Sequence, residues 1–188
     1  MSLRCFAGGE LTRFMPLKEQ SMRILGIDPG LRLTGYALVS VVRMRPQLEE
    51  AGVIRLARHK DIAPRLDELH RQVAALLGEY PCDRVAVEQL YAHYKHPATA
   101  ILMGHARGVI LLAAQQAGVA VVNMPSTLVK KTVTGNGHAS KSQIQRSVAA
   151  LCKLAKPPSP PDVADAIAIA WTLARQLPTA GRRSGRWV

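Results

Sequence analysis

The amino-acid sequence predicts an α/β fold in which one mixed five-stranded sheet is flanked by helices. Apolar runs of strand length and segments with helical spacing follow one another in the order β-β-β-α-β-α-β, with further helices after them. A chain of 188 residues is long enough to bury one full hydrophobic core. Because no internal repeat and no low-complexity linker divides it, we expect a single domain.

Three strands are expected first. Residues 23–28 (RILGID) form a short apolar run that ends in an Asp-Pro-Gly turn. Residues 33–42 and 48–58 form two further runs, each with a glycine inside it. The links between the three runs are short. Short links favour antiparallel pairing, so the sequence predicts a three-stranded meander.

Helices and strands then alternate. Residues 64–77 carry leucine and valine at helical spacing, and Pro64 suits the first turn of that helix. Residues 84–88 (RVAVE) and 119–124 are typical of short buried strands. Between them, residues 97–117 predict a long helix that is apolar on nearly all sides.

The last third of the domain is expected to be helical. Ser126 is predicted to cap a short helix that runs to residue 133, and Ser140 to begin a helix that runs to about residue 154. The segment 156–161 (KPPSPP) is a rigid break. A final helix is predicted over 162–177, with Asp162 as its N-cap.

The two ends of the chain are expected to lie outside a folded domain of residues 22–178. Charged side chains interrupt every apolar stretch of residues 1–21, so no secretory signal forms, and the segment lacks strong periodicity. It is predicted to be a flexible extension, with a true start of the protein at Met22 as the alternative. Residues 179–188 are predicted to be a basic tail. Uninterrupted apolar runs stay shorter than the roughly 18 residues of a membrane span, so no membrane partner is expected. Three cysteines without zinc-ligand spacing indicate reduced thiols in a cytoplasmic protein: Cys5, Cys82 and Cys152.

The charge of the chain favours a polyanionic partner. The net charge is +12, and nucleic acid is the usual partner of such a protein, although some basic proteins are merely soluble. Between Glu88 and Asp162 there is no acidic residue. A folded stretch with charges of one sign predicts a surface that lies against phosphates. Its basic residues include Lys95, Arg107, Lys130, Lys131, Lys141, Arg146, Lys153 and Lys156.

Two carboxylates stand at the ends of apolar strands. Asp28 closes the run ILGI, and Glu88 closes the run VAV. A carboxylate in such a place is costly unless something pairs with it. The alternative role for each carboxylate is to cap a turn. For Asp28, which precedes Pro-Gly, the capping role and a functional role fit equally well. For Glu88 the capping role fits less well.

Two more carboxylates open the last helix. Asp162 and Asp165 are spaced i, i+3, so their side chains share one face of the helix. For an isolated pair, interaction with the helix dipole is the commoner role. The residues that follow (AIAIAWTLA) are almost all apolar, however, which indicates that this helix is buried. An acidic pair at the start of a buried helix favours a site.

If the four carboxylates converge, their repulsion requires a cation. Like charges about 4–5 Å apart repel by roughly 3–4 kcal/mol per pair at an effective dielectric constant near 20. Ligands that are all oxygen select Mg²⁺ or Mn²⁺. Two such ions can activate water and stabilise the leaving oxygen of a phosphoryl transfer. The sequence therefore predicts a metal-dependent nuclease.

Five blocks of the chain together resemble the RuvC family of bacterial crossover junction endonucleases. They are ILGIDPGLRLTGYAL, VAVEQLYAHYK, GHARGVI, VKKTVTGNGHASKSQIQ and DVADAIAIA, in the family's order and spacing from about residue 22 to residue 177. The resemblance implies an RNase H-like fold. It also implies a homodimer that cuts four-way (Holliday) junctions by paired symmetric nicks, with two Mg²⁺ ions per subunit and with RuvA and RuvB as branch-migration partners.

The resemblance also implies roles for individual residues. The four carboxylates match the family's catalytic and metal-binding acids, and Tyr91 matches an aromatic residue that stacks on bases near the crossover. Lys130 and Lys141 match lysines that contact phosphates, and we expect Lys131 and Arg146 to share that work. Tyr91 can instead be a plain surface tyrosine, and any one lysine can be merely solvated.

Several alternatives remain open at this point. An RNase H-like nuclease that acts on another substrate, such as ribosomal RNA, would carry the same acids. A DNA-binding or scaffolding protein without chemistry would not need them. Sugar and acetate kinases carry a similar DPG phosphate loop. Size disfavours this alternative, because those proteins duplicate the fold into two lobes. Gly104 and Gly108, four residues apart in the long helix, are candidates for a dimer interface, with simple core packing as the alternative.

Overall fold

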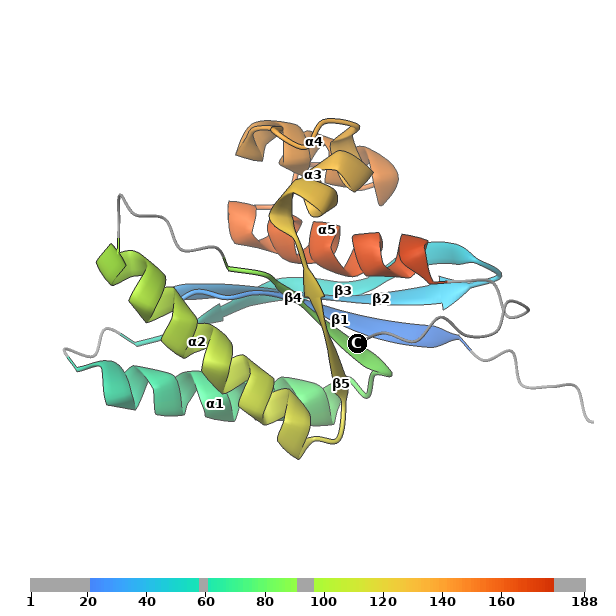
Figure 1. The fold of residues 1–188 in the computed structure, drawn as a ribbon. Coiled ribbons are helices and arrows are strands. Elements are labelled where there is room, and N and C mark those ends of the chain that lie inside the picture. Colours follow the sequence, from blue (N-terminus) through green and yellow to red (C-terminus); the bar gives the residue numbers. More distant parts are fainter. Residues whose placement is uncertain (1–20, 58–60, 91–96, 178–188) are drawn as a thin grey trace, which may run out of the picture.

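The computed structural model describes residues 21–57, 61–90 and 97–177 and contains one five-stranded sheet. The strands stand in the order β3-β2-β1-β4-β5 (Figure 1). Pairing is antiparallel between β1 and β2 and between β2 and β3, whereas β4 and β5 run parallel to β1. The predicted mixed sheet and its antiparallel meander are therefore confirmed. The strand bounds are β1 Met22–Asp28, β2 Leu33–Val42, β3 Arg45–Arg55, β4 Arg84–Glu88 and β5 Ala120–Met124.

Helices cover both faces of the sheet (Figure 1). On one face α5 (Pro161–Gln176) crosses the meander, with α3 (Ser126–Thr134) and α4 (Lys141–Leu151) packed beyond it. On the other face lie α1 (Ile62–Glu79) and α2 (Pro97–Gln116). Because side chains alternate along a strand, β1 supplies both cores: Ile24 belongs to the α5 side and Leu25 to the α1–α2 side.

Two glycines let α5 lie unusually close to the sheet. A Cβ atom at Gly26 of β1 would overlap the backbone oxygen of Ala166. A Cβ atom at Gly35 of β2 would overlap the backbone oxygen of Asp162. Gly35 is also the partner of Asp28 in the β1–β2 register. The absence of a side chain at these positions therefore brings the start of α5 directly over the end of β1.

Several predicted boundaries are wrong for local reasons. Strand β3 begins at Arg45, three residues earlier than predicted, because Arg43 and Met44 make a tight turn with positive φ angles of 47° and 65°. The last helix begins at Pro161 with Pro160 as its N-cap, so Asp162 lies inside the first turn and is not the cap. The cap of α3 is Pro125, not Ser126.

The predicted cap of α4 does form. The Ser140 side chain accepts a hydrogen bond from the Gln143 backbone N–H, and the Gln143 side chain accepts one from the Ser140 backbone N–H. The helix ends at Leu151, three residues before the predicted end, because Lys153 adopts a positive φ of 55° that stops helix propagation.

Within the described residues, one helix is long and apolar enough to cross a membrane by length and composition, namely α2 over Ala98–Gln116. It contains polar positions, so the uninterrupted-run criterion applied to the sequence did not select it. One side of α2 packs on α1 and β5, with Ala106, Ile110 and Ala113 buried. The opposite side is exposed and includes Ile101 and Leu112, at 62% and 51% exposure.

Candidate active site

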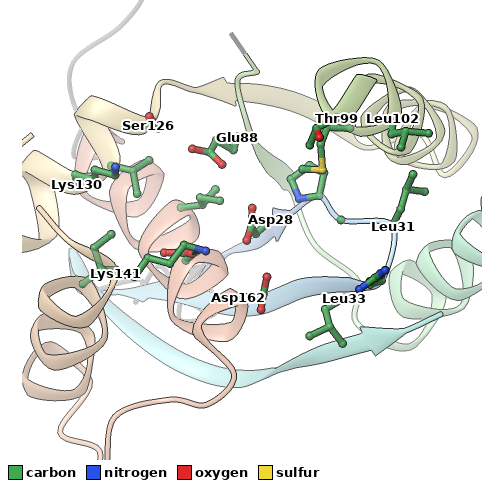
Figure 2. Close-up of a pocket in the computed structure, with 18 of the residues that line it drawn as sticks. Asp28, Leu31, Leu33, Glu88, Thr99, Leu102, Ser126, Lys130, Lys141 and Asp162 are labelled. Carbon is green, nitrogen blue, oxygen red and sulfur yellow. Dashed lines mark ion pairs between the residues drawn. The ribbon is translucent and has the colours of Figure 1, made fainter. Parts of the chain in front are cut away.

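A cavity of about 680 Å³ opens at the carboxyl ends of β1 and β4. Its lining comes from the β1–β2 turn, the end of β4 and helices α1, α2, α3, α4 and α5. The four predicted carboxylates all line it, as Figure 2 shows for three of them: Asp28, Glu88, Asp162 and Asp165. The cavity thus brings together acids that are up to 137 positions apart in the chain (28 to 165).

The sheet positions the first two carboxylates. Strands β1 and β4 are parallel neighbours, and Ile27 pairs with Val87 in their register. Asp28 and Glu88 are the next residues on the two strands, so both side chains emerge at the same edge of the sheet. That edge, at the carboxyl ends of parallel strands, is where open α/β sheets place their ligand sites.

Helix α5 adds the other two carboxylates. The contact between Gly35 and the Asp162 backbone holds the start of the helix beside Asp28. Asp165 lies almost one turn further along the same face. Its Oδ2 atom is 3.9 Å from the Nζ atom of Lys141, whose side chain comes from α4.

Burial and mutual repulsion raise the pKa values of three of these acids. The pKa of Asp28 rises from 3.8 to about 8, first because it is buried and then because Asp165, Glu88 and Asp162 are near, with Lys141 opposing. Burial and the charge of Asp165 raise the pKa of Glu88. The pKa of Asp165 rises through burial and then through Asp162, against Lys141 and Lys130. The lysines therefore neutralise the cluster only in part.

The donor set fits a hard divalent cation. Carboxylate oxygens are the ligands that Mg²⁺ and Mn²⁺ prefer, and an uncompensated negative cluster attracts such an ion. In the described part of the chain, however, no three Asp, Glu, His or Cys side chains stand close enough together to hold a metal as they are. The four acids share the lining of one cavity without meeting at one point.

The predicted DNA-binding residues divide into three groups. Lys130 and Lys141 line the cavity beside the carboxylates (Figure 2). Lys131 and Arg146 are exposed on α3 and α4 and do not line it. Tyr91 lies outside the described residues, so its placement stays a prediction.

Arg107 belongs to the basic stretch that the charge pattern assigns to a phosphate-facing surface, and in the structure it is half-buried and hydrogen-bonded within the fold. Its Nε atom donates to the backbone oxygen of Glu88 at 3.2 Å, and an Nη atom donates to Oδ1 of Asn123. The side chain thus ties α2 to the ends of β4 and β5. The Gln89 N–H donates to the Met124 oxygen at 2.9 Å and so continues the pairing of β4 with β5 past Glu88.

Two further arginines line the cavity and were not singled out in the sequence. Arg32 lies in the β1–β2 turn and Arg65 in α1. Arg65 belongs to a helix of ordinary amphipathic pattern, so neither spacing nor charge distinguished it. Arg32 stands only four residues after Asp28 in the chain. That closeness to a candidate catalytic acid could have singled it out.

Gly104 and Gly108 lie on the exposed side of α2. A Cβ atom at either position would meet no atom within 4 Å among the described residues. Core packing, the alternative considered from the sequence, is therefore wrong for both glycines. The other explanation, an interface with a second chain, is compatible with their exposure.

Comparison with known proteins gives a consistent result. The family model described as crossover junction endodeoxyribonuclease RuvC matches residues 24–173. A RuvC protein of Rhodopirellula baltica is 53% identical over 146 residues, which cover 78% of this chain and 82% of that protein. A RuvC protein of Heliobacterium modesticaldum is 41% identical over 156 residues, 83% of this chain and 96% of that protein.

Solved structures agree with the sequence relatives. Thermus thermophilus RuvC in complex with Holliday junction substrate matches with a TM-score of 0.73 and 32% identity, over 82% of this chain and 95% of that chain. The yeast mitochondrial Holliday junction resolvase shares the fold at a TM-score of 0.61 and 12% identity, over 82% of this chain and 79% of that chain. The RNase H-like fold and the family resemblance predicted from the sequence are confirmed. This chain belongs to the RuvC family of crossover junction endodeoxyribonucleases.

Proposed function

We propose that this protein resolves Holliday junctions in homologous recombination and DNA repair. The observation that carries the proposal is the single cavity in which four carboxylates from β1, β4 and α5 face two lysines from α3 and α4. The junction-bound structure of the Thermus thermophilus relative supports a four-way junction as the substrate. The net charge of +12 suits a substrate whose arms are duplex DNA.

Asp28, Glu88, Asp162 and Asp165 are proposed to hold two Mg²⁺ ions per subunit, and Mn²⁺ can substitute because it accepts the same oxygen ligands. When bound, such ions activate a water molecule and stabilise the leaving oxygen of an in-line displacement. Lys130 and Lys141 bind the non-bridging oxygens of the scissile phosphate and place it against the carboxylates. Hydrolysis leaves a 5′-phosphate and a 3′-hydroxyl, which a ligase can rejoin.

Contacts outside the cavity are proposed to recognise the junction itself. Lys131 and Arg146 are exposed on α3 and α4, the helices that also carry Lys130 and Lys141, and they suit phosphates of the junction arms. Tyr91, three residues after Glu88 in the chain, is proposed to stack on a base exposed at the crossover, a contact worth roughly 1–3 kcal/mol.

We propose a homodimer in which the exposed face of α2 packs on its copy. Ile101, Gly104, Gly108 and Leu112 are spaced by three, four and four residues, so they form one stripe on that face. The two glycines allow close approach of a second backbone. A two-fold dimer presents two active sites to a two-fold substrate and yields paired symmetric nicks. RuvA and RuvB are proposed as further partners, through family membership.

We also propose that the protein works in the cytoplasm, with the stripe on α2 buried in the dimer rather than in a membrane. A second copy of the chain, rather than lipid, would cover the apolar face of α2. Insertion of α2 into a bilayer would break its packing on α1 and β5 and the hydrogen bonds of Arg107. We also propose that residues 22–178 are the nuclease domain, that residues 1–21 are a flexible extension, and that residues 179–188 are a basic tail.

A cleavage assay on a synthetic four-way junction tests the function. We expect paired nicks in Mg²⁺, no cutting in EDTA, and no cutting by Asp28→Asn or Glu88→Gln, each with junction binding retained or tightened. Linear duplex DNA and structured RNA serve as control substrates. Cutting that survives both EDTA and Asp28→Asn would refute the metal–carboxylate mechanism. Preferential cutting of RNA would favour an RNA-processing nuclease instead.

A further inference from the structure

The active-site cavity has a second cationic end, formed by Arg32 and Arg65. Arg65 donates from Nη2 to the backbone oxygen of Leu31 at 2.8 Å, which places its guanidinium group at the β1–β2 turn. In Figure 2 the labelled carboxylates lie between Lys130 and Lys141 on one side and Leu31 and Leu33 on the other. The two arginines and the two lysines therefore belong to opposite ends of one cavity.

Within the described residues, no acidic side chain neutralises the charges of these two arginines. Neither guanidinium group forms an ion pair with a described acidic residue. Lys130 and Lys141 lower the pKa values of the catalytic acids, but neither arginine is among the groups that shift them. The Nε atom of Arg65 is the one buried side-chain nitrogen or oxygen in the described ranges that lacks a hydrogen-bond partner. Such an orphaned charged donor is costly unless a ligand compensates it.

The backbone under these arginines is held in place. Thr34, which is fully buried, donates from its hydroxyl to the Gly30 oxygen at 2.7 Å and accepts from the Gly30 N–H at 3.2 Å. The Leu56 N–H donates to the Arg32 oxygen at 3.2 Å. The turn is thus fixed to β2 and to the residue that follows β3, and Arg65 is fixed to the turn. A rigid base of this kind lowers the entropic cost of holding an anion.

Resting on the proposed function, we infer that Arg32 and Arg65 form a subsite for a second phosphate of the cleaved strand. That phosphate flanks the scissile one, on the side away from Lys130 and Lys141. Planar guanidinium groups match phosphate oxygens in pairs of hydrogen bonds. A strand whose scissile phosphate meets the carboxylates extends along the same cavity, so its next phosphates reach the arginine end. The subsite sets which phosphodiester is centred on the carboxylates.

The test combines arginine variants with single neutral methylphosphonates placed along the cleaved and uncleaved strands around the crossover. Junction binding is measured in EDTA over a range of salt concentrations. We expect wild-type protein to lose about tenfold in affinity at one flanking position of the cleaved strand. Arg65→Gln should bind the unmodified junction about tenfold more weakly, should lose nothing further at that position, and should show a salt slope smaller by about one.

Arg71→Gln is the matched control, because Arg71 lies on the same helix, is exposed and pairs with Asp67 at 3.1 Å outside the cavity. It should behave like wild type at every position. Arg32→Gln, a change at an exposed side chain, should repeat the Arg65→Gln pattern. If Arg65→Gln does not fold, Arg32→Gln takes its place in the test. Thermal unfolding in EDTA identifies such a failure.

The possible outcomes separate the two proposals. If the arginine variants keep the wild-type salt slope and the wild-type methylphosphonate pattern, the subsite is refuted while junction binding stands. Coupling to a phosphate of the uncleaved strand would overturn the assignment to the cleaved strand. If wild-type protein fails to bind the junction at all, the proposed function fails, and the subsite fails with it.

Discussion

At the scale of single residues, Asp28 is the acid of the cavity whose charged form is most disfavoured by burial and by neighbouring charges. It is the most deeply buried of the acids with raised pKa values, and three other carboxylates surround it. In the folded protein without metal its pKa lies near 8, whereas the ordinary value is 3.8. The fold therefore holds the acid in a place that its charged form disfavours, and a bound cation would reverse that preference.

The pH dependence of stability follows from this shift. Between the two pKa values the folded state keeps a proton that the unfolded chain has lost. The free energy of unfolding in EDTA should therefore fall as the pH rises from about 5 to about 8, by up to about 1.4 kcal/mol per pH unit from this group. Urea unfolding across that range measures the trend. Asp28→Asn should reduce it, leaving the contributions of Glu88 and Asp165, whose pKa values are raised in the same direction, and Mg²⁺ should weaken it. A metal-free protein that gains stability over this range would contradict the assignment.

Arg107 is a second residue whose role is local and specific. Its two hydrogen bonds hold the end of β4, where Glu88 leaves the sheet. Arg107→Ala should lower the free energy of unfolding by about 1.5–3 kcal/mol, the usual worth of charge-assisted hydrogen bonds, and should reduce kcat for cutting. Junction affinity in EDTA should stay unchanged.

Arg146→Ala is the contrasting control for Arg107. Its exposed side chain is proposed to contact DNA, so this variant should weaken junction binding with little effect on stability. A loss of junction affinity in Arg107→Ala equal to that in Arg146→Ala would mean that Arg107 acts on DNA, contrary to the contacts it makes in the fold.

At the scale of elements, the seating of α5 on the meander assembles the site. Gly26 and Gly35 leave room for the helix backbone, and the Asp28–Gly35 pairing aligns that room with the strand end. Ten of the 16 residues of α5 are buried, which anchors the helix against displacement. The distance between the strand acids and the helix acids therefore depends on packing rather than on loops.

Gly35→Ala tests this dependence. The added Cβ atom overlaps the Asp162 backbone oxygen, so α5 must shift away from the sheet. We expect a loss of about 1–3 kcal/mol in the free energy of unfolding, as in other overpacked cores. The rate of junction cutting should fall by a larger fraction than the free energy of unfolding does. Gly78→Ala is the control, since Gly78 lies in α1 and an added methyl group there meets no atom of the described residues within 4 Å; it should be neutral or slightly stabilising. Full activity in Gly35→Ala would refute the packing argument.

At the scale of the whole molecule, the exposed stripe of α2 decides whether two active sites act together. Leu112→Glu should convert the dimer to a monomer, because it places a charge in the proposed apolar interface. Analytical ultracentrifugation measures the mass, and a cruciform plasmid assay separates paired cuts from single nicks. We expect single nicks at a reduced rate from the variant.

Met44→Glu is the control for the dimer prediction. Met44 is 68% exposed in the β2–β3 turn, away from α2, so the substitution changes an exposed apolar residue without touching the stripe. It should remain dimeric and make paired cuts. A dimeric Leu112→Glu protein would place the interface elsewhere.

Much of the site could be predicted from the sequence because its acids break local rules. Asp28 and Glu88 end strands made of buried residues, where an unpaired charge is costly. Asp162 and Asp165 open a helix in which the next nine residues are almost all apolar. The wrong cap assignment for Asp162 came from local propensity, which does not distinguish an N-cap from the first turn when two prolines precede the acid.

The sequence by itself determined the order of strands and helices, the four acids and the family, because periodicity, charge and motif spacing are local properties. Only the tertiary structure decided which of the basic residues face the carboxylates. Lys130 and Lys141 enter the cavity, Arg107 turns inward to β4, and Arg65 arrives from a helix on the other face of the sheet. These assignments depend on how helices far apart in the chain pack on the sheet. The sequence around a basic residue does not show which group it will contact, because that contact forms only through this packing.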